Sequence, residues 1–176
     1  HQRHIEITGP GNNSKMVINA FNSGADGYML DLEDSMTPSW YNVINGHYNI
    51  KEATRGNLKD YKYDKDGNLI KEYTINPNDQ PTFFVRTRGL HMLEENVIVN
   101  DKPVPAAIFD IGTFMYHNAK YLYKKGKGPY LYIPNGRYKI GVWIIKLLPK
   151  YFIGYLNTLL PTLILFFIIK LSIKIL

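Results

Sequence analysis

The stretch GYMLDLEDS at residues 27–35 decides the fold that we expect. On an extended chain Tyr28, Leu30 and Leu32 lie on one face, because successive side chains of a strand point to opposite sides. A strand with one apolar face buries that face against other elements of the fold. The pattern therefore predicts a half-buried strand at the centre of the domain.

Three carboxylates, Asp31, Glu33 and Asp34, stand within four positions at the end of this strand. Parallel α/β sheets and barrels build their sites at the carboxyl ends of the strands, so this acidic end is a candidate site. One alternative stays open on this segment alone: residues 31–35 form an acidic turn that caps a helix beginning near Pro38. We interpret Asp34 as such a helix cap.

Residues 82–89, TFFVRTRG, predict a second strand that is rich in β-branched and aromatic side chains. It ends in Arg86 and Arg88, which stand two positions apart, so both guanidinium groups are expected on the same face. Two strands thereby bring opposite charges to one end of the sheet. This combination favours a site for an anion.

The pattern around these two strands alternates between strands and helices. Further strands are expected at residues 4–8 and 129–134, helices at 15–22, 38–45 and 109–124, and hairpins at 58–75, turning at 66–68, and at 96–106, turning near Asn100 and Asp101. Four strands that alternate with three helices predict the α/β class and about the first half of a parallel (β/α)₈ TIM barrel. We assign residues 1–136 to this partial barrel domain.

The composition divides the chain into an acidic and a basic part. The chain has 176 residues, and 45% of them are apolar, which is enough for a core. All 15 acidic residues lie at or before Asp110, whereas residues 111–176 hold ten Lys and Arg and no acid. The basic turn at residues 124–127 carries no RNA-binding aromatic signature, so we expect no nucleic-acid partner. Without Cys, the sequence excludes disulfides, thiolate nucleophiles and Cys-ligated zinc.

Residues 137–176 form an apolar, basic tail that breaks the pattern. Of these 40 residues, 18 are Ile or Leu, and no polar turns mark further strand–helix units. Residues 151–169 hold no charge and reach the roughly 20-residue length of a membrane span, although Gly154, Asn157 and Pro161 weaken that interpretation. The alternative is sequence from a shifted reading frame or an unspliced intron. The abundance of residues that AT-rich codons encode favours this alternative.

Five runs, in this order and at this spacing, resemble malate synthase of the A type, an enzyme of the glyoxylate cycle. They are IEITGP at residues 5–10, KMVINAFNSGADGYMLDLEDS at 15–35, VRTRGLH at 85–91, FDIGTFMYHNAK at 109–120 and GKGPYLYIP at 126–134. The resemblance covers about residues 3–135. It implies a TIM barrel in which acetyl-CoA and glyoxylate, with Mg²⁺, condense to malyl-CoA, which is hydrolysed to malate and CoA. It also implies a peroxisomal, glyoxysomal or cytoplasmic location, with a membrane location only if the tail is genuine.

The resemblance also implies roles for the charged residues. The first Arg of the family's R-x-R-G motif, a catalytic acid–base residue, falls on Arg86. Removal of an acetyl methyl proton needs a cation at the developing enolate oxygen, and a guanidinium supplies it without losing its own proton. Asp31 and Glu33 match the acidic strand end and are candidate substrate-binding residues that orient this Arg and the metal-bound water. Arg88 is a further candidate for substrate binding, although we prefer a salt bridge with the acidic strand for it.

The sequence departs from the family beyond the matched region. The family's two metal ligands and its catalytic Asp lie downstream, and residues 137–176 contain no Asp or Glu. We therefore expect an inactive, truncated fragment without the Mg²⁺ ligands. Two alternatives stay open: a citrate-lyase β-chain-like, Mg²⁺-dependent carbon–carbon lyase, which also joins a DLED strand end to an Arg-bearing strand, and a non-catalytic, membrane-associated product. The ITGP, HNAK and GPYLY runs argue against the lyase.

Overall fold

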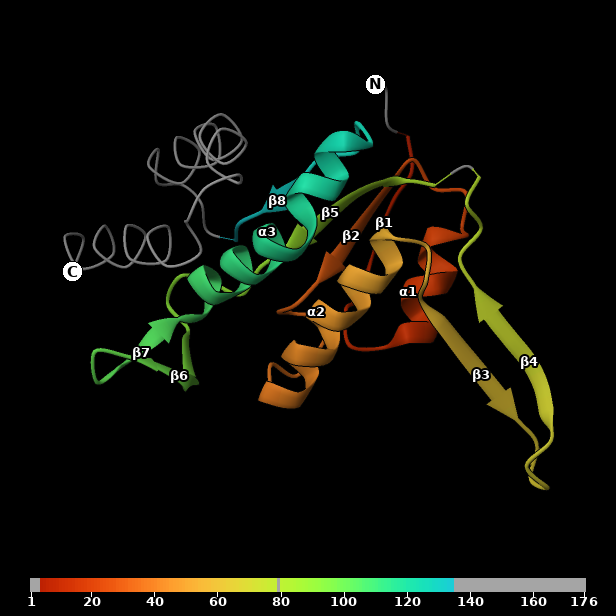
Figure 1. Ribbon diagram of the computed structural model, residues 1–176, viewed down its shortest axis with the longest axis horizontal. Helices are drawn as coiled ribbons and strands as arrows, with labels where there is room; N and C mark the ends of the chain where they lie inside the picture. Colours follow the sequence, from red (N-terminus) through yellow and green to blue (C-terminus); the bar gives the residue numbers. More distant parts are fainter. Residues whose placement is uncertain (1–3, 79, 135–176) are drawn as a thin grey trace.

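A parallel sheet forms the centre of the computed structural model, which describes residues 4–78 and 80–134 (Figure 1). Its strands are β1 (Glu6–Pro10), β2 (Gly27–Asp31), β5 (Thr82–Arg86) and β8 (Leu131–Tyr132), in the order β1-β2-β5-β8. The helices α1 (Ser14–Phe21), α2 (Trp40–Thr54) and α3 (Ala106–Lys124) lie on the viewer's side of the sheet in Figure 1. This arrangement confirms the α/β class with a parallel sheet.

The predicted apolar face of β2 lies at the centre of the core. Tyr28, Leu30 and Leu32 are all completely buried. The Tyr28 ring packs edge-on against Phe21 of α1 and beside Phe83 of the neighbouring strand β5. Burying a large apolar side chain stabilises a fold by about 1.5–3 kcal/mol. This face of β2 therefore explains why the helices cover this side of the sheet.

Helix α2 is longer than the sequence suggested. We expected it to end before Gly46, but it continues to Thr54. A β-carbon at position 46 would stand 2.6 Å from Leu32 Cδ2, so the glycine lets the helix lie close to the chain after β2. Val43 and Ile50, one on each side of the glycine, are both buried. This packing offsets the cost of about 1 kcal/mol that a glycine brings to a helix interior.

Two antiparallel hairpins extend from the sheet, as predicted. Strands β3 (Lys59–Tyr63) and β4 (Leu69–Thr74) form the hairpin that projects to one side in Figure 1, and β6 (Leu93–Val99) and β7 (Lys102–Pro105) form the second. Asn100 and Asp101 turn the second hairpin with φ angles of 51° and 61°. Positive φ at both central residues is typical of a two-residue hairpin turn. This hairpin leads directly into α3.

The predictions about the tail lie outside the described residues. They are the domain boundary at residue 136 and the candidate membrane span at residues 151–169. Among residues 4–78 and 80–134, no helix has both the length and the apolar character that crossing a membrane requires.

Candidate functional site

Arg86 and Asp31 are neighbours at the carboxyl ends of β5 and β2. The parallel register pairs the two residues directly, so the sheet itself brings the opposite charges together. Arg86 Nη1 lies 3.3 Å from Asp31 Oδ2, and Arg86 Nη2 lies 2.9 Å from Glu33 Oε2. Nη2 also pairs with the Asp34 carboxylate. One guanidinium therefore meets three carboxylates, which we call the acidic cluster (Asp31, Glu33 and Asp34).

Asp31 shapes the loop that carries the other two carboxylates. It accepts hydrogen bonds from the main-chain N–H groups of Glu33 and Ser35, at 2.8 and 3.2 Å, and from the Ser35 hydroxyl at 2.8 Å. Asp side chains commonly organise turns in this way. Gly89 leaves room for this loop, because a β-carbon there would stand 3.0 Å from Glu33 Oε1. The loop is therefore held in the conformation that turns Glu33 toward Arg86.

The interpretation of Asp34 as a helix cap is wrong. The side chain of Ser39 caps α2 by accepting a hydrogen bond from the main-chain N–H of Asn42 at 3.4 Å. Asp34 stands five positions before this cap, and its carboxylate pairs with Arg86 instead. Because a cap residue directly precedes its helix, Asp34 stands too early in the chain to cap α2.

The surroundings keep Arg86 charged. Burial by itself would lower the pKa of its guanidinium, but the hydrogen bond with Asp34 and the charges of the acidic cluster outweigh burial, and the pKa is raised. Tyr132 is the register partner of Arg86 on β8, and its ring centroid lies 5.7 Å from the guanidinium carbon. An aromatic ring at this distance adds a further attraction for the cation.

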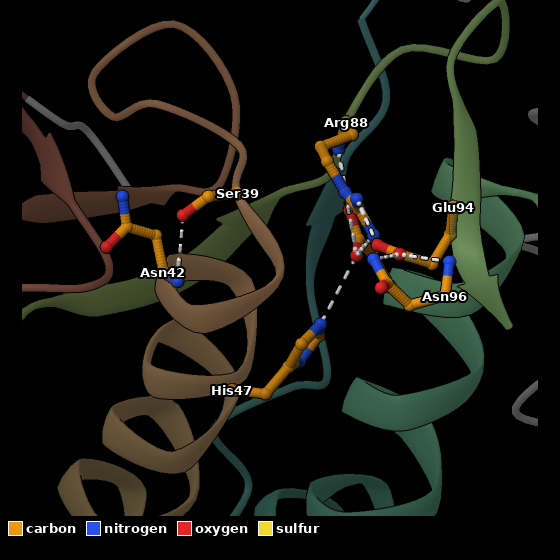
Figure 2. Close-up of polar contacts among 7 residues, drawn as sticks. Ser39, Asn42, His47, Arg88, Glu94 and Asn96 are labelled. Carbon is orange, nitrogen blue, oxygen red and sulfur yellow. Dashed lines mark hydrogen bonds and ion pairs between the residues drawn. The ribbon is translucent and has the colours of Figure 1, made fainter.

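Arg88 lies in a separate, buried cluster and not beside the acidic strand (Figure 2). Its Nε and Nη2 groups donate to Asp110 of α3 at 3.1 and 2.8 Å, and its Nη1 group donates to Glu94 of β6 at 2.7 Å. His47 of α2 completes the cluster, with Nε2 3.3 Å from Asp110 Oδ1. We call these four residues the buried ionic network. Arg88 is only 2% exposed, so this geometry favours a structural role over contact with a substrate.

The buried ionic network keeps its carboxylates charged despite their burial. Desolvation alone would raise the pKa of Asp110, but hydrogen bonds from His47 and Arg88 outweigh it, and the pKa is lowered. The pKa of Glu94 is lowered as well, because hydrogen bonds from Asn96 and Arg88 outweigh desolvation. Removing one partner of such a pair leaves an uncompensated buried charge. The network therefore ties α2, α3 and β6 to the end of β5.

The contribution of Asp110 to stability should depend on pH. A carboxyl group whose pKa is lower in the folded state stabilises the fold above its unfolded pKa, about 3.9 for Asp, and this contribution is lost as the pH falls through the folded value. The difference in unfolding free energy between the unchanged chain and Asp110→Asn should therefore narrow below about pH 4. Urea unfolding of both proteins across this range measures it. A difference that stays constant on acidification would contradict the ion pair.

Sequence reasoning missed the three partners of Arg88. A signal for Asp110 was present, because a carboxylate on the apolar side of an aromatic-rich helix requires a partner. No local signal identifies His47, since it lies 63 positions from Asp110 in the chain. Glu94 likewise stands in a hairpin strand whose other residues are mostly exposed.

The described residues do not by themselves form a metal site. In this part of the chain no group of three or more His, Asp or Glu side chains is arranged to hold a metal ion. The carboxylates of the acidic cluster are already paired with Arg86, which does not fit a site for Mg²⁺.

A parallel α/β sheet that gathers an arginine and carboxylates at the carboxyl ends of its strands has the architecture of a barrel-enzyme site. Comparisons with known proteins agree with this class. Residues 82–145 match the family described as "Malate synthase, TIM barrel domain". The chain is 44% identical over 132 residues to a "Bifunctional glyoxylate cycle protein" of Caenorhabditis elegans, 41% over 132 residues to a malate synthase of Myxococcus xanthus, and 39% over 132 residues to malate synthase A of Escherichia coli.

These matches cover 75% of this chain, but only 13%, 23% and 24% of the three relatives. The matched part is therefore related to the malate synthase family of enzymes, in its TIM-barrel domain. The chain spans about a quarter or less of the length of these relatives.

Proposed function

We propose that residues 1–136 are about the first half of a malate synthase TIM barrel and carry one side of its active site. The reaction is the condensation of acetyl-CoA with glyoxylate and water to give malate and CoA. The observation that carries this proposal is Arg86, held by carboxylates at the carboxyl end of a parallel strand in a segment about 40% identical to malate synthases.

In this proposal Arg86 is the catalytic residue of the described part. Loss of a methyl proton from acetyl-CoA places negative charge on the thioester oxygen, and a nearby guanidinium stabilises that charge in the transition state. Three carboxylates already orient the side chain, so little reorganisation is needed during the reaction. We assign Asp31 and Glu33 the task of holding Arg86 in this orientation at the substrate.

The same proposal covers partners and location. Acetyl-CoA and glyoxylate are the expected substrates, and Mg²⁺ is the expected metal, with its ligands outside the described residues. Relatives from Candida tropicalis and Gossypium hirsutum are named glyoxysomal malate synthases, which supports a peroxisomal or glyoxysomal location, with the cytoplasm as the alternative. The malate synthase matches do not favour a citrate-lyase-like enzyme. The activity of the isolated chain tests the other alternative, a non-catalytic, membrane-associated product.

The 176-residue chain expressed alone should show no malate synthase activity. A parallel barrel closes with eight strands over about 250 residues, whereas the described sheet has four strands in which β1 and β8 each pair on one side only. The described site also offers Arg86 but no unpaired carboxylate to act as the base. The measurement is the release of free CoA from acetyl-CoA with glyoxylate and Mg²⁺. Glyoxylate-dependent turnover by the purified chain would contradict the partial-barrel proposal.

An active background for substitutions is a chimera in which the matched 132 residues of this chain replace the corresponding segment of E. coli malate synthase A. In this chimera Glu33→Gln should lower kcat about ten- to a hundredfold, because a misplaced catalytic group loses its near-attack geometry. Glu95→Gln, which removes an exposed carboxylate, is the matched control and should leave kcat unchanged. Equal kcat values for the two variants would remove Glu33 from the site.

A further inference from the structure

The buried ionic network also holds the main chain next to Arg86. Asp110 Oδ2 accepts a hydrogen bond from the main-chain N–H of Arg88 at 2.9 Å, in addition to the bonds from the Arg88 side chain. One carboxylate thereby fixes both the main chain and the side chain two positions after Arg86. Asp110 is itself completely buried on α3, which Phe114 anchors in the core.

Main-chain hydrogen bonds to the neighbouring strands also hold this segment. On one side, the main-chain N–H of Leu32, directly after β2, donates to the carbonyl of Arg86 at 3.0 Å. Strand β5 ends at Arg86, and the next main-chain N–H, that of Thr87, donates to the carbonyl of Tyr132 at 3.2 Å. Strand β8, which provides that carbonyl, has two residues, and such a short strand is a weak support. Residue 88 lies beyond these two bonds, and there the bond to Asp110 joins the main chain after β5 to the long helix α3.

We propose that Asp110 is a positioning residue for Arg86: by holding Arg88 it fixes the end of β5, so that the Arg86 guanidinium faces the acidic cluster. Asp110 acts through the main chain and touches no substrate. The inference rests on the catalytic role proposed for Arg86. The placement of the guanidinium can nevertheless be measured without any turnover.

Glu94 provides a matched control within the same network. It is 3% exposed and pairs with Arg88 Nη1, but its other hydrogen bonds are with Asn96, and it accepts none from the main chain of residues 86–89. Glu94→Gln therefore removes a buried carboxylate without releasing the end of β5. Asp110→Asn, in contrast, removes the buried carboxylate that holds the end of β5.

The experiment uses phenylglyoxal, which reacts with guanidinium groups, on the 176-residue chain, with the rate at each arginine read by peptide mass spectrometry. Arg55 is the internal reference for global unfolding, since it binds the main-chain carbonyl of His117 and the side chain of Asn118, away from the acidic cluster. Asp110→Asn should raise the rate at Arg86 relative to Arg55 about tenfold, the factor expected for one lost charge-assisted hydrogen bond. Glu94→Gln should leave this ratio as it is in the unchanged chain.

A ratio that rises equally in both variants, or in neither, overturns the proposal, because the network then only stabilises the fold. If Asp110→Asn unfolds, Asp110→Glu, which keeps the charge but moves it by one methylene, is judged by the same ratio. A raised ratio together with full turnover of an Arg86→Lys chimera would support the positioning role and contradict only the proposed function.

Discussion

Arg86→Lys in the chimera should lower kcat about 10²- to 10³-fold, the loss typical of removing one donor that stabilises a developing oxyanion. The ammonium group of Lys keeps the charge but not the planar fork, so it cannot meet the acidic cluster and a substrate oxygen in one geometry. The KM for acetyl-CoA should change little, because the interaction that is lost forms in the transition state. Steady-state release of CoA measures both constants.

The thermal midpoint of this variant should stay near that of the unchanged chimera, because the Arg86 side chain is partly exposed and a cation remains beside the carboxylates. Arg55→Lys is a control for the general effect of exchanging these two residue types. Near-normal kcat in Arg86→Lys would remove Arg86 from the mechanism. A loss of kcat that matches the fraction of unfolded protein would show a structural effect instead.

Arg88→Met should lower the unfolding free energy of the 176-residue chain by about 3–5 kcal/mol, the cost of breaking a buried ion pair by removing one partner. The substitution leaves Asp110 and Glu94 buried without the cation that they share. Methionine roughly keeps the volume of the side chain, so the loss comes mainly from the charges. Urea unfolding followed by circular dichroism measures it.

The triple variant Arg88→Met, Glu94→Gln, Asp110→Asn tests the reason for this loss. It removes the charge of Arg88 together with those of the two carboxylates paired with it. Its unfolding free energy should therefore recover in part compared with that of Arg88→Met alone. Lys59→Met, which breaks an exposed pair with Glu72, should change stability little. A loss in Arg88→Met no larger than that in Lys59→Met would contradict the buried ionic network.

The pairing of Arg86 with Asp31 could be predicted because both residues belong to regular strands. Alternation placed Tyr28, Leu30 and Leu32 on one face, and the parallel register then set the two strand ends side by side. The same rule failed for Arg88. It holds only while the chain remains a strand, and β5 ends at Arg86, so Arg88 turns toward α3.

The remaining differences come from packing between distant parts of the chain. Gly46 is locally typical of a helix end, yet α2 continues through it, and the close approach of Leu32 explains why a glycine stands there. Asp34 was expected to cap a helix beginning near residue 38, but Ser39 caps α2, and the Asp34 carboxylate pairs with Arg86, 52 positions later. Neither outcome follows from local propensity, because the deciding partner lies far away in the sequence.

The chimera itself tests the central claim most directly, namely that this chain carries a working part of a malate synthase site. Its glyoxylate-dependent release of CoA should remain within about tenfold of that of the E. coli enzyme, since substitutions away from the reacting groups affect positioning more than chemistry. A chimera that folds with an unchanged thermal midpoint and binds acetyl-CoA, yet shows no glyoxylate-dependent CoA release, would contradict the claim.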